Sequence, residues 1–106
     1  MNSMLLPEAV RVLALPAVDQ LAVLSDLGCP GVIDELALQF HARAVLADQF
    51  QEAGEITPEQ LAVVRGLDEA LTGMSGRHTA ALWTEDALHE SALWERVRYR
   101  AKSFFD

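Results

Sequence analysis

The chain has 106 residues, 51% of them hydrophobic, so it is long enough to bury one core and too short to divide into several domains. Its formal net charge of −8 disfavours non-specific contact with nucleic acid or with an anionic membrane, because long-range attraction follows the summed charge. We therefore expect a single domain over residues 1–106 whose partners are not polyanions.

The cysteine count and the hydropathy pattern bear on location. Cys29 is the only cysteine, so no disulfide can form within the chain, and a reducing compartment fits better than an oxidising one. No apolar run approaches the roughly 18 residues that span a bilayer, and the first six residues lack the basic start of a signal peptide. These features predict a cytoplasmic protein without a membrane partner.

The first third of the chain reads as two short helices. Pro7 and Pro16 each suit the first turn of a helix, where the missing N–H has no partner to lose, and they predict helices near residues 7–15 and 17–27. The glycines and the proline of residues 28–31 then predict a tight connection.

The longest helix is expected over residues 32–53, ending before Gly54. Its apolar residues recur at steps of three and four, as on the inward face of a helix. They are Ile33, Leu36, Phe40, Ala44, Ala47 and Phe50. This helix is predicted to be the spine of the core.

The next boundary carries the strongest local signal in the chain. Thr57 is a helix N-cap, Pro58 suits the first helical position, and Gln60 completes a capping box. Ile56 is placed to pack on Leu61 as a hydrophobic staple. We therefore predict that a helix starts at Pro58.

The remaining helices follow from glycine and cap residues. The helix from Pro58 is expected to end at the glycines of residues 73–76, and a loop follows. Thr84 can cap a short helix through Leu88, and Ser91 can cap a last helix. The inward residues of that last helix are Trp94, Val97, Ala101 and Phe104 or Phe105. The predicted fold is all-α, a bundle-like domain of five or six helices.

No complete catalytic, cofactor or metal motif is present. Ser75 lies outside a nucleophile elbow, and Cys29 has no basic neighbour to activate it. His41 stands seven residues from an aspartate on either side, which is about 10.5 Å along a helix and too far for ligands of one ion. We expect a protein that is not an enzyme and that needs no cofactor.

Two features favour a protein partner. Acidic residues are expected along one side of the central helices, and an ordinary solvated face is the alternative interpretation. They are Asp34, Glu35, Asp48, Glu52, Glu55 and Glu59. Trp83 precedes the Thr84 cap and is either an interface anchor or a staple against Leu88.

The charge is unevenly distributed along the chain. Residues 1–95 hold 4 basic and 15 acidic side chains, net −11, and residues 96–106 hold 4 basic and 1 acidic, net +3. The basic residues Arg96, Arg98, Arg100 and Lys102 surround Tyr99, which could contact nucleic acid. Cations are also favoured at any helix C-terminus, and these four divide between two helix faces, so nucleic acid is the less favoured ligand.

Residues 82–101 include the run Leu-Trp-Thr-Glu-Asp-Ala-Leu and the segment Trp94-Glu95-Arg96-Val97-Arg98. This closing segment, about a fifth of the chain, resembles that of small acidic helical bacterial immunity proteins, which block a toxin made by the same cell. The resemblance implies a toxin-neutralising role and carries over no site residue, since such proteins share neither a motif nor a fold.

Together these features favour a non-enzymatic protein-binding module that covers a basic partner, such as a toxin, through an acidic surface. One alternative is a small regulatory subunit that contacts nucleic acid through the C-terminal basic helix. Another is a homo-oligomer that packs its helix faces on each other.

Overall fold

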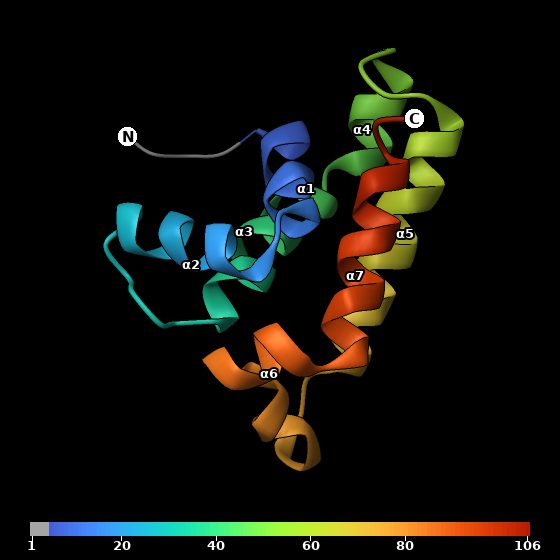
Figure 1. The fold of residues 1–106 in the computed structure, drawn as a ribbon. Helices are drawn as coiled ribbons and strands as arrows, with labels where there is room; N and C mark the ends of the chain where they lie inside the picture. The colour runs from blue at the N-terminus through green and yellow to red at the C-terminus, as the bar shows by residue number, and fades with distance from the viewer. Residues whose placement is uncertain (1–4) are drawn as a thin grey trace.

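The computed structural model describes residues 5–106, with the backbone alone at Arg77 and His78. Across these residues the chain forms seven α-helices and one 3₁₀ helix, and no strand (Figure 1). The elements are α1 (Leu6–Ala14), α2 (Ala17–Asp26), α3 (Asp34–Ala44), α4 (Ala47–Glu52), α5 (Pro58–Gly73), η1 (Arg77–Trp83), α6 (Glu85–Glu90) and α7 (Ala92–Ser103). The predicted all-α, bundle-like class is confirmed.

Helices α1 and α2 have the boundaries that the prolines predict. Pro7 lies in the first turn of α1, and Pro16 is the N-cap residue of α2. The connection from α2 to α3 contains Gly28 at φ 83° and Gly31 at φ 76°. Residues with a Cβ atom rarely adopt these positive φ values, whereas glycine does so freely. These glycines let the chain reverse within a few residues.

The single long helix predicted over residues 32–53 is wrong. Helix α3 ends at Ala44, and α4 begins at Ala47 after a turn in which Leu46 has φ −100° and ψ 3°. Val45 and Leu46 are 60% and 39% exposed, so their side chains make no core contact that would favour a continuous helix through this turn. The turn directs α4 onto α5, where Ala47 is 2% exposed. Tertiary packing therefore overrides local helix propensity here.

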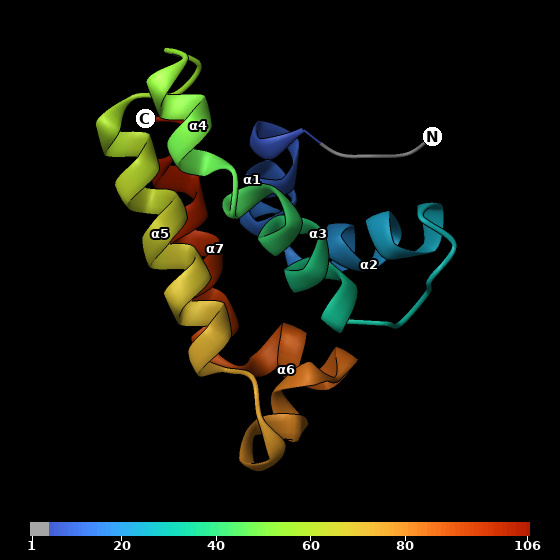
Figure 2. The same cartoon turned by 180° about the vertical axis from the view of Figure 1, so that it is seen from behind.

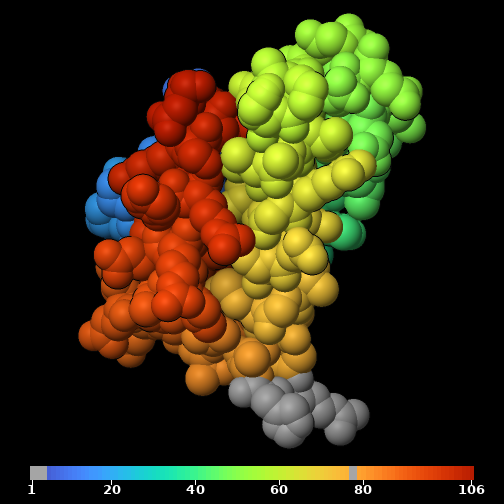
Figure 3. Space-filling model, turned by 90° about the vertical axis from the view of Figure 1, so that its right-hand side faces the viewer, coloured from blue at the N-terminus to red at the C-terminus, as the bar shows by residue number. Residues whose placement is uncertain are grey.

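Helix α7 lies between α1 and α5 and runs opposite to α5 (Figures 1 and 2). The space-filling view shows α7 and α5 in contact along their length (Figure 3). The predicted inward residues of α7 are buried: Trp94, Val97, Ala101 and Phe104. Phe105, the alternative to Phe104, is 44% exposed. The core therefore has α7 at its centre and not the predicted spine helix.

Trp94 is the largest side chain that is wholly out of solvent. Its indole Nε1 donates to the carbonyl of Leu82 at 2.7 Å. Its ring packs edge to face against that of Trp83, with 5.3 Å between the ring centroids. A buried indole needs such an acceptor, because an unpaired buried N–H is destabilising. Trp94 thereby fixes η1, which forms where the sequence predicted a loop, against α7.

The predicted caps are confirmed. The Thr57 hydroxyl accepts from the Gln60 amide N–H at 3.0 Å, and the Gln60 side chain accepts from the Thr57 N–H at 2.9 Å. Thr84 and Ser91 cap α6 and α7 through their hydroxyls. Gln60 Nε2 also donates to the Phe104 carbonyl at 3.0 Å, which ties the end of α7 to the start of α5.

The helices share one cluster of buried apolar side chains, which includes Ile56 and against which the partly buried Leu61 packs. The Cα radius of gyration is 13.2 Å, close to the roughly 13 Å expected of a folded chain of about 100 residues. In the described part of the chain, every helix is too short or too polar to cross a bilayer.

Candidate protein-binding surfaces

The six predicted acidic residues lie in two places, because α3 and α4 are separate helices. Asp34 and Glu35 occupy the first turn of α3, beside the α2–α3 connection. Asp48 lies in the first turn of α4, and Glu52, Glu55 and Glu59 lie around the connection from α4 to α5, at the far end of that helical layer (Figure 2). The acidic surface is therefore spread over the molecule and does not form one continuous stripe.

Some of the acidic side chains are already paired. Asp48 forms an ion pair with Arg65, and Asp68 Oδ1 is within hydrogen-bond distance of His41 Nδ1 at 2.8 Å. Glu35 accepts a hydrogen bond from Gln39 at 2.8 Å. Asp48 and Glu35 are consequently less available to a partner than Asp34, which is exposed at the start of α3.

Asp34 and Trp83 are 49 positions apart in the sequence and line the same pocket of about 410 Å³. Helix α3 also contributes Leu38 to this pocket, and the connection after α5 contributes Ser75 and Gly76. Trp83 is partly buried, and its indole Nε1 donates to the Met74 carbonyl at 2.8 Å. The pocket, called here the Asp34–Trp83 pocket, thus combines a carboxylate with an anchored aromatic ring.

An exposed apolar stripe runs from this pocket along the outer side of α3. Leu38 is 58% exposed, Ala42 is exposed, and Val45 is 60% exposed at the end of the helix. Steps of four and three residues place them on one face. We call Leu38, Ala42 and Val45, together with the Asp34–Trp83 pocket, the α3 surface. Helix α3 faces the viewer in Figure 2.

Leu38, Ala42 and Val45 lie outside the inward face that the sequence predicted for residues 32–53. The sequence nevertheless carries a signal for this stripe, because the segment that forms α3 has apolar residues on two faces, and the core of the fold uses only one of them. Exposed apolar residues become informative when they adjoin each other and a pocket, because single ones are common on any protein.

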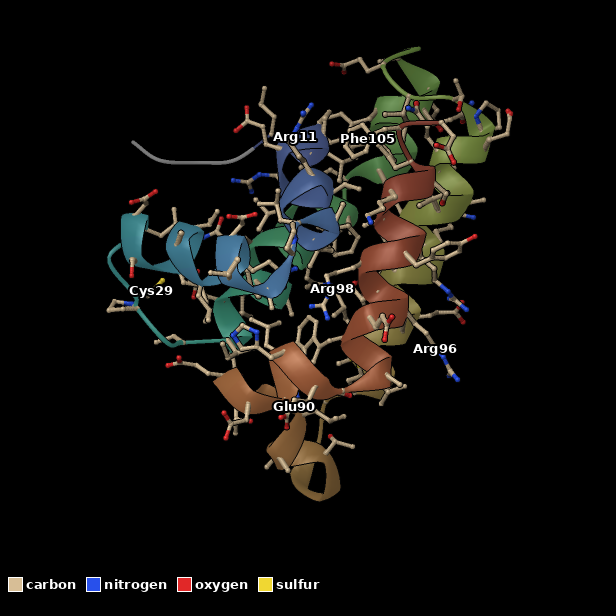
Figure 4. The ribbon with its side chains drawn as sticks, in the orientation of Figure 1. Arg11, Cys29, Glu90, Arg96, Arg98 and Phe105 are labelled. Carbon is tan, nitrogen blue, oxygen red and sulfur yellow. The ribbon has the colours of Figure 1, made fainter. Side chains whose placement is uncertain are left out.

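The four C-terminal basic residues are separated by the structure. Arg98 points into the space between α7 and the first two helices, and Arg96 points away from it (Figure 4). Arg98 Nη1 donates to Gln20 Oε1 at 3.2 Å and to the Leu88 carbonyl at 3.0 Å. Burial lowers the pKa of Arg98, and the nearby Glu95 opposes that change. Arg98 therefore has an internal role that the sequence did not reveal.

Gln20 is the other half of this arrangement. It is 0% exposed, and its Nε2 donates to the carbonyls of Val12 and Leu13, each at 3.1 Å. Both carbonyls belong to the last turn of α1, where the helix leaves carbonyls without the usual partner, and that of Val12 also accepts from the Leu15 N–H at 3.2 Å. Gln20 and Arg98 thus connect α1, α2, α6 and α7 through hydrogen bonds.

An open groove of about 980 Å³ lies between α7 and the corner where α1 meets α2. Its α7 side includes Arg98, Tyr99 and Lys102, and Tyr99 is 77% exposed. Pro16 and Val18 are on the opposite side, and Val18 is 66% exposed. This feature, called here the α7 groove, gathers most of the predicted nucleic-acid contacts at one place.

Among the described side chains, no group of three or more His, Cys, Asp or Glu residues is close enough to hold a metal ion. Cys29 is partly buried and is not in a disulfide. No protein-family model, curated protein or solved structure matches this chain.

Proposed function

We propose that the protein is a non-enzymatic binding module whose α3 surface covers a basic protein partner, in the manner of a bacterial immunity protein that blocks a toxin. The observation that carries the proposal is the continuity of the exposed stripe with the Asp34–Trp83 pocket through Leu38. An apolar patch next to an acidic, aromatic pocket has the composition of a protein interface.

The chemistry of the pocket favours an arginine or lysine side chain of the partner. The Asp34 carboxylate attracts a cation, and an indole such as that of Trp83 adds a cation–π attraction of about 0.5–2 kcal/mol. Trp83 is held in place by Met74 and Trp94, so little conformational freedom is lost when a ligand binds. The pocket thus supplies an orienting contact for the complex.

The net charge of the whole chain also favours a positively charged partner. A net charge of −8 attracts a basic protein over distances longer than any contact and raises the association rate at low salt. The scattered acidic residues Glu52, Glu55 and Glu59 then act through the overall field and do not need to lie in the interface.

A second copy of this chain is the alternative occupant of the α3 surface, because Leu38 and Val45 are exposed. A symmetric pair would place the two copies of Asp34 in one interface and would bring together two chains of charge −8. We therefore expect a monomer in sedimentation velocity at 100 mM salt. A stable dimer that Leu38→Asp dissociates would favour self-association instead.

The test uses tagged protein as bait in a lysate of its source cells, followed by purification of the retained protein and titration calorimetry. A basic protein is expected, with Kd raised about tenfold or more by Asp34→Asn and by Leu38→Ser, since buried anchors commonly contribute more than 1 kcal/mol. Asp19→Asn on α2 removes the same charge from an exposed position outside the α3 surface and is the control.

The acidic field is tested by association kinetics with the same partner. Glu52→Lys and Glu55→Lys should slow association at 20 mM salt and have little effect at 500 mM salt, because salt screens charges outside the interface. If Asp34→Asn and Leu38→Ser bind as tightly as the wild type, the α3 surface is not the interface and the proposal fails.

A further inference from the structure

We propose that the α7 groove binds a short acidic segment of a protein, one that also carries apolar side chains. This site has the opposite charge to the α3 surface and lies on other helices, so the inference does not depend on the proposed function. It would make the protein an adaptor with one surface for a basic protein and one for an acidic peptide.

The first argument is the charge of the groove. Its lining includes Arg98 and Lys102, opposed by the single carboxylate of Glu95. Arg96 and Arg100 also belong to the lining, but Arg96 points away from α1 and α2 (Figure 4), and Arg100 Nη1 lies beside Gly66 of α5. Among the described residues, Lys102 has no ion pair or hydrogen bond from its side chain. A groove of this charge on a chain of net −8 is a local reversal of sign, which an acidic ligand complements.

The second argument is that Arg98 is already oriented. Both of its internal hydrogen bonds start from Nη1, while a guanidinium has five N–H donors in a fixed plane. The donors on Nη2 and Nε therefore stay available to a carboxylate, which guanidinium binds in a forked geometry. Because Gln20 and the Leu88 carbonyl fix the side chain beforehand, binding loses less side-chain entropy than it would at a mobile arginine.

The third argument is the apolar side of the groove. Ala14, Pro16, Ala17 and Val18 come from the α1–α2 corner, and Val18 is 66% exposed. Tyr99 faces solvent at 77% exposure and can cover an apolar side chain while its hydroxyl stays in water. A ligand with both carboxylates and apolar groups satisfies both sides of the groove.

These features favour a peptide over a nucleic acid. A polynucleotide extends beyond the groove and meets the residues 1–95, whose net charge is −11. A short peptide stays within the groove, and charges more than about 8 Å away are largely screened at physiological salt. Nucleic acid also offers few aliphatic groups for the Pro16 and Val18 side of the groove.

The test measures capture of fluorescein-labelled 12-residue peptides by the full-length protein. One pool contains Asp, Glu, Leu and Phe, a second replaces the acids by Asn and Gln, and a third replaces them by Lys and Arg. We expect the acidic pool to be retained at least fivefold over the amide pool at 100 mM salt. Lys102→Glu and Tyr99→Ala, both at exposed positions, should each reduce that retention by about fivefold or more.

Arg65→Glu is the matched control, because it makes the same charge change on α5 outside the groove, and retention should stay within twofold of the wild type. A labelled 12-mer of thymidine is measured in parallel. Equal retention of the acidic and amide pools overturns the proposal, as does insensitivity to Lys102→Glu and Tyr99→Ala. Tighter retention of the oligonucleotide, lost in the same variants, overturns it in favour of a nucleic-acid site.

Discussion

Gln20 is the polar side chain that lies wholly out of solvent among those the structure describes. The prediction is that Gln20→Leu, which keeps the size and removes the amide, lowers the free energy of unfolding by about 2–4 kcal/mol. It leaves the Leu13 carbonyl and one donor of Arg98 without partners in a buried place, while the Val12 carbonyl keeps only its hydrogen bond from the Leu15 N–H. Urea denaturation followed by circular dichroism measures the change.

Gln49→Leu is the control for that substitution, because Gln49 is exposed on α4, and its effect should be within about 0.5 kcal/mol. Similar stability for the two variants would show that water replaces the amide of Gln20. The sequence does contain a signal for this residue, since positions 17, 20 and 24 share the buried face of α2 and only position 20 is polar. A polar residue at an inward position indicates a partner, but the partner Arg98, 78 positions away, depends on the fold.

At the scale of single elements, the capping box of α5 gives a second prediction. Thr57→Ala should lower the free energy of unfolding by about 1 kcal/mol, while Thr57→Ser, which keeps the hydroxyl, should have a smaller effect. Gln60→Ala should be more destabilising than Thr57→Ala, because it also breaks the hydrogen bond to the Phe104 carbonyl that ties α7 to α5. Urea denaturation checks this order, and Thr72→Ala, exposed near the end of α5, serves as control.

The caps and breaks explain how much of the fold the sequence could predict. Boundaries marked by Pro7, Thr57, Thr84 and Ser91 involve atoms within a few residues of each other, and the structure confirms them. The turn after Ala44 contains no glycine or proline, so its cause is the packing of α4 on α5 and leaves no local mark. Local hydrogen bonds are readable from sequence, whereas packing between distant helices is not.

The same distinction holds for the candidate sites at the scale of the whole molecule. Asp34, Trp83 and the C-terminal cations were identified by residue type alone, and their meeting places were not. The pocket needs α3 and the segment after α5 to converge, and the α7 groove needs the α1–α2 corner. The residue types thus suggested the components. The fold determined which of them lie together, and it pairs Arg98 Nη1 with Gln20 and the Leu88 carbonyl.

The net charge of −8 gives a prediction for the molecule as a whole. Like charges repel more in the compact state than in the unfolded chain, so screening by salt should stabilise the fold. Between 20 and 500 mM NaCl we expect the free energy of unfolding to rise by on the order of 0.5–1 kcal/mol. Arg65→Glu changes the net charge to −10, that is −8 − 2, and Glu55→Lys changes it to −6, that is −8 + 2, both at exposed positions.

The rise with salt should therefore be largest for Arg65→Glu, intermediate for the wild type and smallest for Glu55→Lys. Urea denaturation at both salt concentrations gives the three differences. The exposed Asp48–Arg65 ion pair is itself screened by salt, so its loss in Arg65→Glu adds to the difference in the same direction, and Glu55→Lys tests the overall charge without it. A fall with salt in the wild type would mean that the paired charges, such as Arg65 with Asp48, outweigh the general repulsion. In that case the ion pairs within the fold would already compensate part of the acidic charge, and a basic partner would gain less from neutralising it.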